Sequence, residues 1–325
     1  MKHPAILAAA LATGLIASDA AAQQELRFGH IGKPGSLFEA TVNEFVRRAN
    51  ESLGEDYVVR AYGANQLGND QELLQKLKLG QVTFALPSSI MSSVAPEFGV
   101  FEMPYIIRDR AHIKAVSQEL LDEVFQPAVE AQGYQILSFV ENGFRHITNN
   151  VRPINVPADL EGIKLRTPRG EWRVKMFQSY GANPTPMAFS DVFTALQTGV
   201  IDGQENPYAQ IASAKFQEVQ EYLSITGHVY SPAYILTSGR SFDRLPEDVQ
   251  ATLRTAALET QDWVYVEAAR LEDELLAVIE PQVAINEADK QAFIDASAAI
   301  YEEFGSSVEG GSALIERVMG LAPTN

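Results

Sequence analysis

The chain of 325 residues contains no cysteine. A disulfide framework is therefore excluded, and so is a reaction that depends on a cysteine nucleophile. Stability has to come from the burial of apolar side chains, and a chain of this length can form a sizeable core. Chains of this size often divide into two lobes.

Histidine is also scarce. The chain has five histidines, and no two of the four beyond His3 have the i, i+4 spacing of a zinc-binding helix. The sequence has neither a G-x-S-x-G nucleophile motif nor a G-x-x-x-x-G-K-[ST] phosphate loop. Asp202 and Glu205 offer a carboxylate pair for acid–base chemistry, but a chain with 42 acidic residues contains many such pairs by chance. The sequence therefore gives no positive support for an enzyme, and we expect no metal ion or other cofactor.

Basic residues are outnumbered, with 25 lysines and arginines against 42 acidic residues and a net charge of −17 at pH 7. This excess of negative charge argues against binding to nucleic acid or to anionic membranes, which attract basic surfaces. It also makes arginines inside a pocket informative, because local positive groups would have to overcome a repelling field before an anionic ligand could bind.

Long hydrophobic runs are absent apart from residues 5–17, which follow a short positive start at Lys2. This run is shorter than the roughly 20 residues that a membrane-spanning helix needs. Ala20 and Ala22 fit the small-x-small rule of signal peptidase cleavage. We therefore expect residues 1–22 to be a signal peptide, and the mature protein to be exported rather than embedded in a membrane.

Strand and helix patterns alternate along the chain, which predicts an α/β fold with a mainly parallel sheet. Strands are predicted at residues 25–30, 57–62, 82–87, 134–140 and 163–166. Helices are predicted at residues 36–49, 69–80, 117–132, 171–180, 190–197, 289–303 and 312–319, and residues 181–186 are predicted to be a loop. Residues 246–280 carry one uninterrupted helical pattern, about 52 Å long at 1.5 Å per residue. A helix of that length could span two lobes.

Two arginines stand at the expected carboxyl ends of strands, where open α/β sheets bind ligands. Arg145 follows one strand in NGFRHITNN, and Arg166 ends another in GIKLRTP. A guanidinium group offers a planar donor fork that matches a carboxylate and keeps its charge. The alternative for each arginine is a surface salt bridge. The polar run DGQENP, residues 202–207, is likewise either a surface turn or part of a site.

Several strings together resemble the substrate-binding proteins of TRAP (tripartite ATP-independent periplasmic) transporters, the DctP family. They are LRFGH, NQLGNDQELLQKLKLGQVTFAL, GFRHITNNVRPINVPADLEGIKLRTP, GANPTPMAFSDVFTALQTGVIDGQENP and KFQEVQEYLSITGH. The resemblance implies a type II-like fold of two lobes that close over an organic acid and deliver it to a permease with one small and one large membrane subunit. It places lobe 1 at residues 23–145 plus about 232–270, and lobe 2 at residues 146–231 plus about 271–325, with the long helix spanning both.

The resemblance also implies roles for individual residues. Arg166 would hold the ligand carboxylate, Arg145 would assist it, and Asn206 would hydrogen-bond the same carboxylate. Phe189 would pack against the ligand, and Ser88 would complete the site from the first lobe. The remaining polar residues of DGQENP would then build the turn and hinge without touching the ligand.

The first-lobe side of the pocket departs from sialate-binding members of the family, which carry charged groups there. This chain has Ile31, Ser88, Ser89 and Met91 at those places. We therefore expect a hydroxy acid, a keto acid or a compact sugar acid as the ligand. Trp172 is either an apolar wall of the pocket or a core residue, and Arg169 and Arg173 are expected to be surface charges.

Two other functions stay open at this point. One is an exported hydrolase or lyase that acts on an acidic sugar, with Glu205 or Asp202 as the base. The other is a sensor that presents its ligand-bound form to a membrane kinase, which would use the same closure of the lobes. We expect a monomer, because the sequence shows no exposed apolar stripe.

Overall fold

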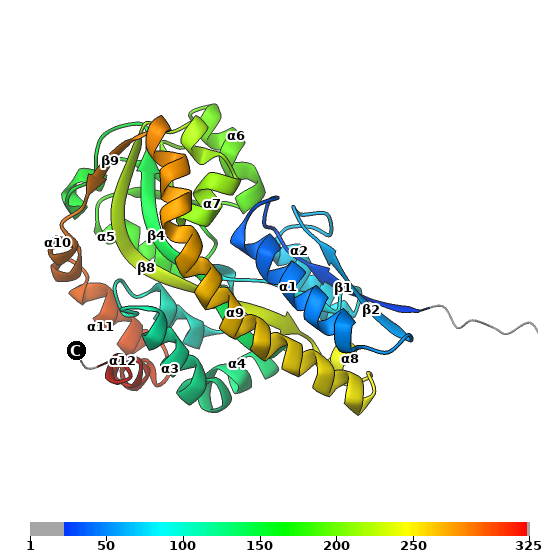
Figure 1. Cartoon of the computed structure of the whole chain (residues 1–325). Coiled ribbons are helices and arrows are strands. Elements are labelled where there is room, and N and C mark those ends of the chain that lie inside the picture. The colour runs from blue at the N-terminus through cyan, green and yellow to red at the C-terminus, as the bar shows by residue number, and fades with distance from the viewer. Residues whose placement is uncertain (1–22, 324–325) are drawn as a thin grey trace, which may run out of the picture.

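The computed structural model describes residues 23–323 (Figure 1). The expected signal peptide, residues 1–22, lies outside the described residues. In the described part of the chain, nine strands form one sheet in the order β2-β1-β3-β8-β4-β7-β5-β6, with β9 paired to β8. The strands are β1 (Gln24–Gly29), β2 (Tyr57–Tyr62), β3 (Phe84–Ala85), β4 (Gln135–Asn149), β5 (Lys164–Thr167), β6 (Asn183–Pro186), β7 (Gly203–Asn206), β8 (Tyr222–Thr237) and β9 (Ala284–Glu287).

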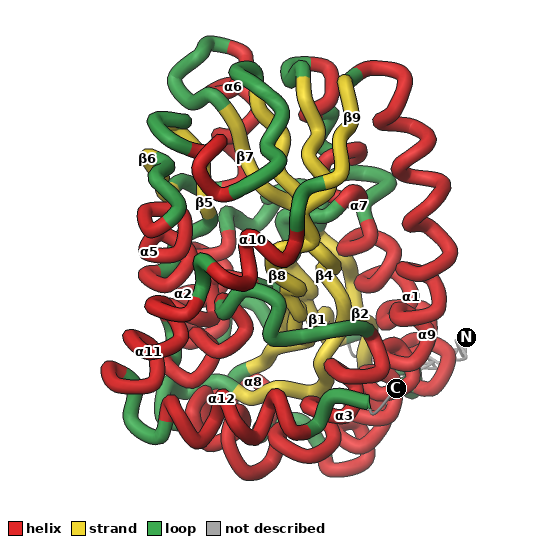
Figure 2. Tube along the Cα trace, turned by 90° about the vertical axis from the view of Figure 1, so that its left-hand side faces the viewer, coloured by secondary structure: helices red, strands yellow, loops and turns green. Residues whose placement is uncertain are grey.

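The sheet is parallel toward its two edges and antiparallel at its centre. β1 pairs in parallel with β2 and β3, and β5 pairs in parallel with β6 and β7. β8 is antiparallel to β3 and β4, and β4 is antiparallel to β7. Figure 2 shows β5 to β7 toward one end of the molecule and β1 and β2 toward the other, with β4 and β8 between them. The α/β class is confirmed, with a mixed sheet.

β4 is longer than predicted, and this corrects the placement of Arg145. The strand expected to end at residue 140 continues to Asn149, so Arg145 lies within it rather than after it. The register shifts between Glu141 and Gly143, where Gly143 has a φ of +121° that favours glycine. The bulge bends the strand without ending its pairing. A second correction concerns residues 181–186, which were expected to be a loop and contain β6.

The helices follow the apolar periodicity, with ends set by local caps. They are α1 (Leu37–Ser52), α2 (Asp70–Leu79), α3 (Arg110–Leu120), α4 (Gln126–Glu130), α5 (Glu171–Ser179), α6 (Val192–Gln197), α7 (Tyr208–Ser213), α8 (Gly239–Phe242), α9 (Glu247–Ile279), α10 (Lys290–Asp295), α11 (Ala298–Ser307) and α12 (Gly311–Gly320). Ser36 caps α1 by accepting a hydrogen bond from the backbone N–H of Glu39. At the start of α2, Asn69 and Glu72 form a reciprocal capping box, and Gly80 ends the helix with a φ of +70°.

The long helix predicted at residues 246–280 is confirmed as α9, which has 33 residues. It runs along the molecule and packs against α1, β4 and α7 (Figure 1). The predicted lobe boundaries, at residues 145/146 and 231/232, fall inside β4 and β8. The division into two lobes stays a prediction, and these two long strands would be the connections between the lobes.

Candidate ligand-binding site

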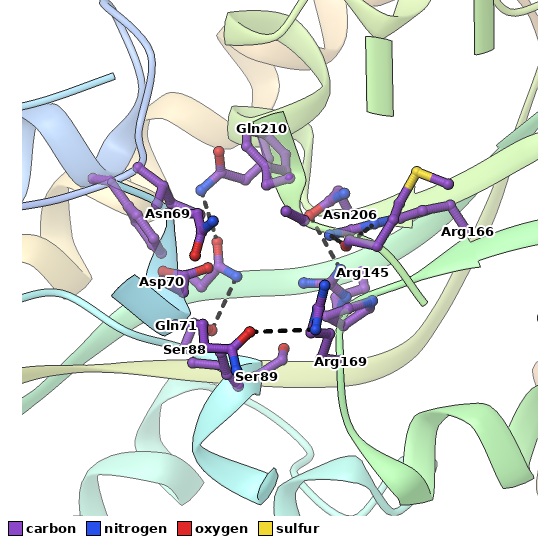
Figure 3. Close-up of a pocket in the computed structure, with 18 residues that line it drawn as sticks. Asn69, Asp70, Gln71, Ser88, Ser89, Arg145, Arg166, Arg169, Asn206 and Gln210 are labelled. Atoms are coloured by element: carbon purple, nitrogen blue, oxygen red, sulfur yellow. Dashed lines mark hydrogen bonds between the residues drawn. The ribbon is translucent and has the colours of Figure 1, made fainter. Parts of the chain in front are cut away.

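A cavity opens where the N-terminus of α2, the 3₁₀ turn Ser89–Ser93 and the strands β4, β5 and β7 meet (Figure 3). Five of the six residues expected at a ligand site line it, namely Ser88, Arg145, Arg166, Phe189 and Asn206. Asn69, Asp70, Gln71, Ser89, Asn142, Arg169 and Gln210 supply further polar groups. The cavity therefore brings together segments that are up to 179 residues apart in sequence (Ile31 to Gln210).

Arg166 lies on β5 and is 3% exposed. Its Nε and Nη2 both donate to the carbonyl oxygen of Met187, at 3.1 and 2.7 Å, and Nη1 makes no hydrogen bond to any described residue. Within residues 23–323, no carboxylate lies within salt-bridge distance of it. Burial lowers the pKa of the Arg166 guanidinium to about 9, so the group stays charged at neutral pH. Arg166 is thus a buried cation without a counterion.

Arg145 on β4 is buried too, but its charge is matched. Nε donates to Oε2 of Glu205 at 2.5 Å, and Nη2 donates to Oε1 of the same carboxylate at 2.8 Å. Nη2 also donates to the Glu205 carbonyl oxygen at 2.6 Å and to Oδ1 of Asn206 at 3.1 Å. Two of the guanidinium nitrogens are therefore fully occupied by β7, which holds Asn206 beside Arg145 (Figure 3).

Arg173 is not a surface charge as expected, since its side chain is fully buried. It lies on α5 with Nη1 2.6 Å from Oε2 of Glu205 and Nε 2.6 Å from Oε2 of Glu102. Burial lowers the pKa of Arg173, but Glu102 and Glu205 outweigh that effect and raise it. Arg169, the other arginine expected at the surface, is exposed, and it also lines the mouth of the cavity.

Glu205 is the centre of this buried network. Burial raises the pKa of its carboxyl group, but Arg145 and Arg173 outweigh burial and hold the pKa well below its usual range. His228 approaches Oε2 of Glu205 with its Nε2 at 3.1 Å, and Thr226 lies 2.7 Å from its Nδ1. Burial lowers the pKa of His228 to about 4, so the neutral ring donates from Nε2 to the carboxylate.

The buried charges do not cancel. Arg145 and Arg173 carry two positive charges, and Glu102 and Glu205 carry two negative charges in contact with them. Arg166 adds a positive charge that none of these carboxylates contacts. Among these five buried groups, the positive charge left unpaired is that of Arg166, and this charge attracts an anion despite the negative net charge of the protein.

Asp70 faces the cavity from the opposite wall, as the first residue of α2 (Figure 3). The side chain is half-buried, and its carboxylate makes no hydrogen bond or ion pair with the described residues. Burial raises the pKa of Asp70 to about 7, against the opposing effect of Arg166. Next to it, Gln71 accepts a hydrogen bond from Nη1 of Arg169 at 3.3 Å.

A hydrogen-bonded chain crosses the floor of the cavity. Nε2 of Gln210 on α7 donates to Oδ1 of Asn142 at 3.2 Å, and Nδ2 of Asn142 donates to Oγ of Ser88 at 3.1 Å. The Ser88 hydroxyl in turn donates to the carbonyl oxygen of Pro232 on β8 at 2.7 Å. Asn142 on β4 thereby connects residues assigned to the two predicted lobes.

The sequence analysis missed Asp70, Asn142 and Gln210. Asp70 stands in LGNDQE, where the first-turn acid was interpreted only as part of a helix cap. Asn142 is three residues before Arg145, a spacing that puts two residues on opposite faces of a regular strand. The bulge next to Gly143 removes that alternation, so both side chains reach the cavity.

Of the two aromatic residues proposed for the site, one lines the cavity and the other does not. Phe189 lines the cavity and packs edge-on against Phe216, with 5.6 Å between ring centroids. Trp172 is not among the lining residues. It is 4% exposed and packs edge-on against Phe304 of α11 at 5.1 Å, which makes it part of the core.

Among residues 23–323, no helix has the length and apolar character that crossing a membrane requires. The same residues contain no group of three or more histidine, aspartate or glutamate side chains placed to hold a metal ion.

Comparison with known proteins places these features in a family. Residues 28–307 match the family model "Bacterial extracellular solute-binding protein, family 7" (DctP). The 2,3-diketo-L-gulonate-binding periplasmic protein YiaO of Escherichia coli is 30% identical over 324 residues, which cover 98% of this chain and 99% of that protein.

Solved structures of similar proteins have the same fold. The sugar acid binding protein DctPAm from Advenella mimigardefordensis, in complex with galactonate, has a TM-score of 0.88 at 30% identity, covering 92% of this chain and 97% of that one. A TRAP periplasmic solute-binding protein from Polaromonas, bound to D-erythronate, has a TM-score of 0.86 at 29% identity, covering 93% and 100%. The chain belongs to family 7 of the bacterial extracellular solute-binding proteins, the DctP-type receptors of TRAP transporters.

Proposed function

We propose that this protein is a periplasmic receptor that binds a small organic acid through a carboxylate held by Arg166 and delivers it to the membrane subunits of a TRAP permease. The observation that carries the proposal is the isolation of Arg166, a buried residue of the cavity wall whose charge no carboxylate of residues 23–323 contacts and whose Nη1 bonds to none of them. A ligand carboxylate would supply the missing counterion, and a charge-assisted hydrogen bond in such a site is strong.

Arg145 and Asn206 shape the carboxylate site. Because Glu205 neutralises Arg145, this arginine adds hydrogen-bond donors rather than net charge, with Nη1 unbonded among the described residues. Asn206 accepts from Arg145 through Oδ1 and donates through Nδ2 to Gln204 at 2.5 Å. The second amide proton of Asn206 is then available to the ligand carboxylate.

The arrangement favours a receptor over an enzyme acting on an acidic sugar. Glu205, one of the two candidate bases, is fully buried, does not line the cavity, and is held ionised by two arginines. Asp202, the other candidate, accepts a hydrogen bond from the backbone N–H of Lys164 at 2.8 Å and supports the packing of β5 on β7. Neither group is placed to exchange a proton with a ligand at Arg166.

The ligand class follows from the walls of the cavity and from the relatives. The known ligands of the relatives described above are sugar acids and an aldonate of four carbons. The polar groups around the cavity are mostly neutral amides and hydroxyls, which suit a compact hydroxy or sugar acid. We propose that the protein binds such an acid as a monomer, in the periplasm, after removal of its signal peptide.

Thermal unfolding of residues 23–325 with a panel of organic acids tests the proposal. The panel holds hydroxy acids, keto acids, aldonates, uronates and C4-dicarboxylates. A ligand at 100 times its Kd stabilises the folded state by about 2.7 kcal/mol, which moves the Tm of a protein of this size by several degrees. A shift with one acid class, and recovery of that acid unchanged, supports a receptor. Conversion of the acid to a product would support the enzyme instead.

A further inference from the structure

Asp70 and Arg166 lie on different walls of the same cavity (Figure 3). Asp70 belongs to α2 and Arg166 to β5, so the two groups come from segments assigned to different lobes. The position of Asp70 is set locally, because the capping box between Asn69 and Glu72 fixes the first turn of α2. A ligand whose carboxylate binds Arg166 would therefore present its other end to Asp70.

The Asp70 carboxylate is chemically distinct from the other acidic groups near the cavity. Glu205 and Glu102 are both matched by arginines, whereas Asp70 makes no hydrogen bond or ion pair within the described part of the chain. An ionised carboxylate accepts hydrogen bonds and donates none. It can thus accept a bond from a ligand hydroxyl, but it repels a second carboxylate in a partly desolvated site.

We propose that Asp70 determines the specificity of this site, so that the protein selects monocarboxylates with a hydroxyl group at the far end and rejects dicarboxylates of the same length. This inference rests on the proposed function, because it requires that Arg166 hold the first carboxylate. The groups that would surround the far end of such a ligand with Asp70 are Ser88, Asn142 and Gln210, which are uncharged.

Arg169 also lines the cavity, and its positive charge would favour a second carboxylate. Its side chain is exposed and its Nη1 donates to Gln71, so its charge is screened by water. Asp70 is half-buried, and its repulsion of an anion is less screened than the attraction by Arg169. The balance of the two charges therefore disfavours a dicarboxylate.

Two matched ligand pairs test the inference by titration calorimetry at about pH 8, where Asp70 is ionised. The four-carbon pair is D-erythronate and meso-tartrate, and the six-carbon pair is D-galactonate and galactarate. The wild-type protein is expected to bind the monocarboxylate of at least one pair at least about tenfold more tightly than the dicarboxylate. In Asp70→Asn, which keeps the shape of the side chain, this ratio is expected to fall by at least about tenfold.

The control for net charge is Glu55→Gln. Glu55 is an exposed acid before β2 that does not line the cavity, and its replacement is expected to leave the ratio unchanged. Asp70→Ser serves as a second variant, because it removes the charge and leaves the capping box of Asn69 and Glu72 in place. Thermal unfolding confirms that each variant is folded before its ratio is measured.

Each outcome has a definite consequence. The inference about Asp70 is overturned if the wild type shows equal affinities, or a preference for the dicarboxylate, in every pair that it binds, or if the ratio is unchanged in both Asp70 variants. If Arg166→Ala abolishes binding while the Asp70 variants keep the ratio, only that inference fails and the proposed function stands. If no acid of either pair or of the panel binds to the wild type, the proposed function fails and the inference fails with it.

Discussion

Arg145 and Glu205 form a bidentate ion pair in which the two side chains are only 2% and 0% exposed. A cation neutralised in this way holds its neighbours in place but adds no net charge to the cavity. The pair therefore separates two roles that the sequence had assigned jointly to Arg145 and Arg166. Arg145 organises the β4–β7 side of the site, and Arg166 is the charge that remains for a ligand.

Replacing Arg166 with alanine is expected to weaken binding of the cognate acid by about 2–5 kcal/mol, a loss of roughly 30-fold or more in affinity. The ligand carboxylate would be buried without its charged partner. Calorimetric titration measures the change, and Arg108→Ala, at an exposed arginine away from the cavity, is the control. Wild-type affinity in Arg166→Ala would contradict the assignment of the carboxylate site.

The same substitution is expected to spare the stability of the ligand-free protein. Arg166 is a buried charge without a counterion, so its removal is not expected to lower the free energy of unfolding in the absence of ligand. Urea unfolding of ligand-free protein checks this expectation. A large loss of stability would mean that Arg166 has a structural partner.

Replacing Glu205 with glutamine is expected to lower the free energy of unfolding by about 3–5 kcal/mol, because it leaves Arg145 and Arg173 buried with only Glu102 to compensate them. Urea denaturation provides the measurement. Glu55→Gln, which removes an exposed carboxylate, is expected to change stability by less than about 0.5 kcal/mol. A similar small effect in Glu205→Gln would show that the network contributes little.

Asp70 makes the stability of the ligand-free protein depend on pH. Its pKa is raised from 3.8 to about 7 in the folded state, so the folded protein keeps this proton where the unfolded chain has lost it. The stability from Asp70 is fully present below about pH 4 and is lost as the pH rises through 7. Arg166 is the charged group that opposes this shift.

The difference between Asp70→Asn and the wild type isolates this effect, because other titrating groups contribute equally to both proteins. The variant is expected to gain stability relative to the wild type as the pH rises from 4 to 8. Urea unfolding across that range measures the gain. A difference that does not vary with pH would mean that the pKa of Asp70 is close to its value in the unfolded chain.

Replacing Asn142 with alanine is expected to weaken ligand binding by about 0.5–1.5 kcal/mol for each hydrogen bond of the chain from Gln210 to Ser88 that it breaks. Ser88→Ala is the matched comparison. It removes the hydrogen bond from Asn142 and the one to Pro232, but it leaves the hydrogen bond between Gln210 and Asn142 in place. Small-angle scattering with and without ligand measures whether closure is affected. If both variants bind and close as the wild type does, the chain of hydrogen bonds plays no part in holding the site together.

Local sequence patterns were sufficient for the features that depend on neighbouring residues. The apolar spacing of residues 246–280 predicted α9 nearly to the residue, and the helices predicted at residues 36–49 and 69–80 begin at Ser36 and Asn69, which cap α1 and α2. Helix periodicity and caps act over a few residues, so they can be recognised without knowledge of the fold. The family strings around Arg166 and Asn206 likewise predicted residues that the structure places at the cavity.

Patterns of this kind could not reveal which charges are paired. Arg173 was expected at the surface because charges on helices are usually solvated, yet Glu102 and Glu205 reach it from segments 71 and 32 residues away. Asp70 is the opposite case, an acid in the first turn of an ordinary helix that has no partner among residues 23–323 and lines a cavity. The energy of a buried charge depends on what lies within a few ångströms of it, and those neighbours come from elements that only the fold brings together.

The amino-acid sequence by itself thus determined the α/β class, the long helix and the family, since these follow from local periodicity and from motifs that are contiguous in the chain. Only the tertiary structure decided that Arg145 and Arg173 are neutralised, that Arg166 keeps its charge, and that Asp70 faces the same cavity. These properties come from distances between residues remote in sequence, and electrostatic interactions in a low-dielectric interior depend on those distances more than on residue type.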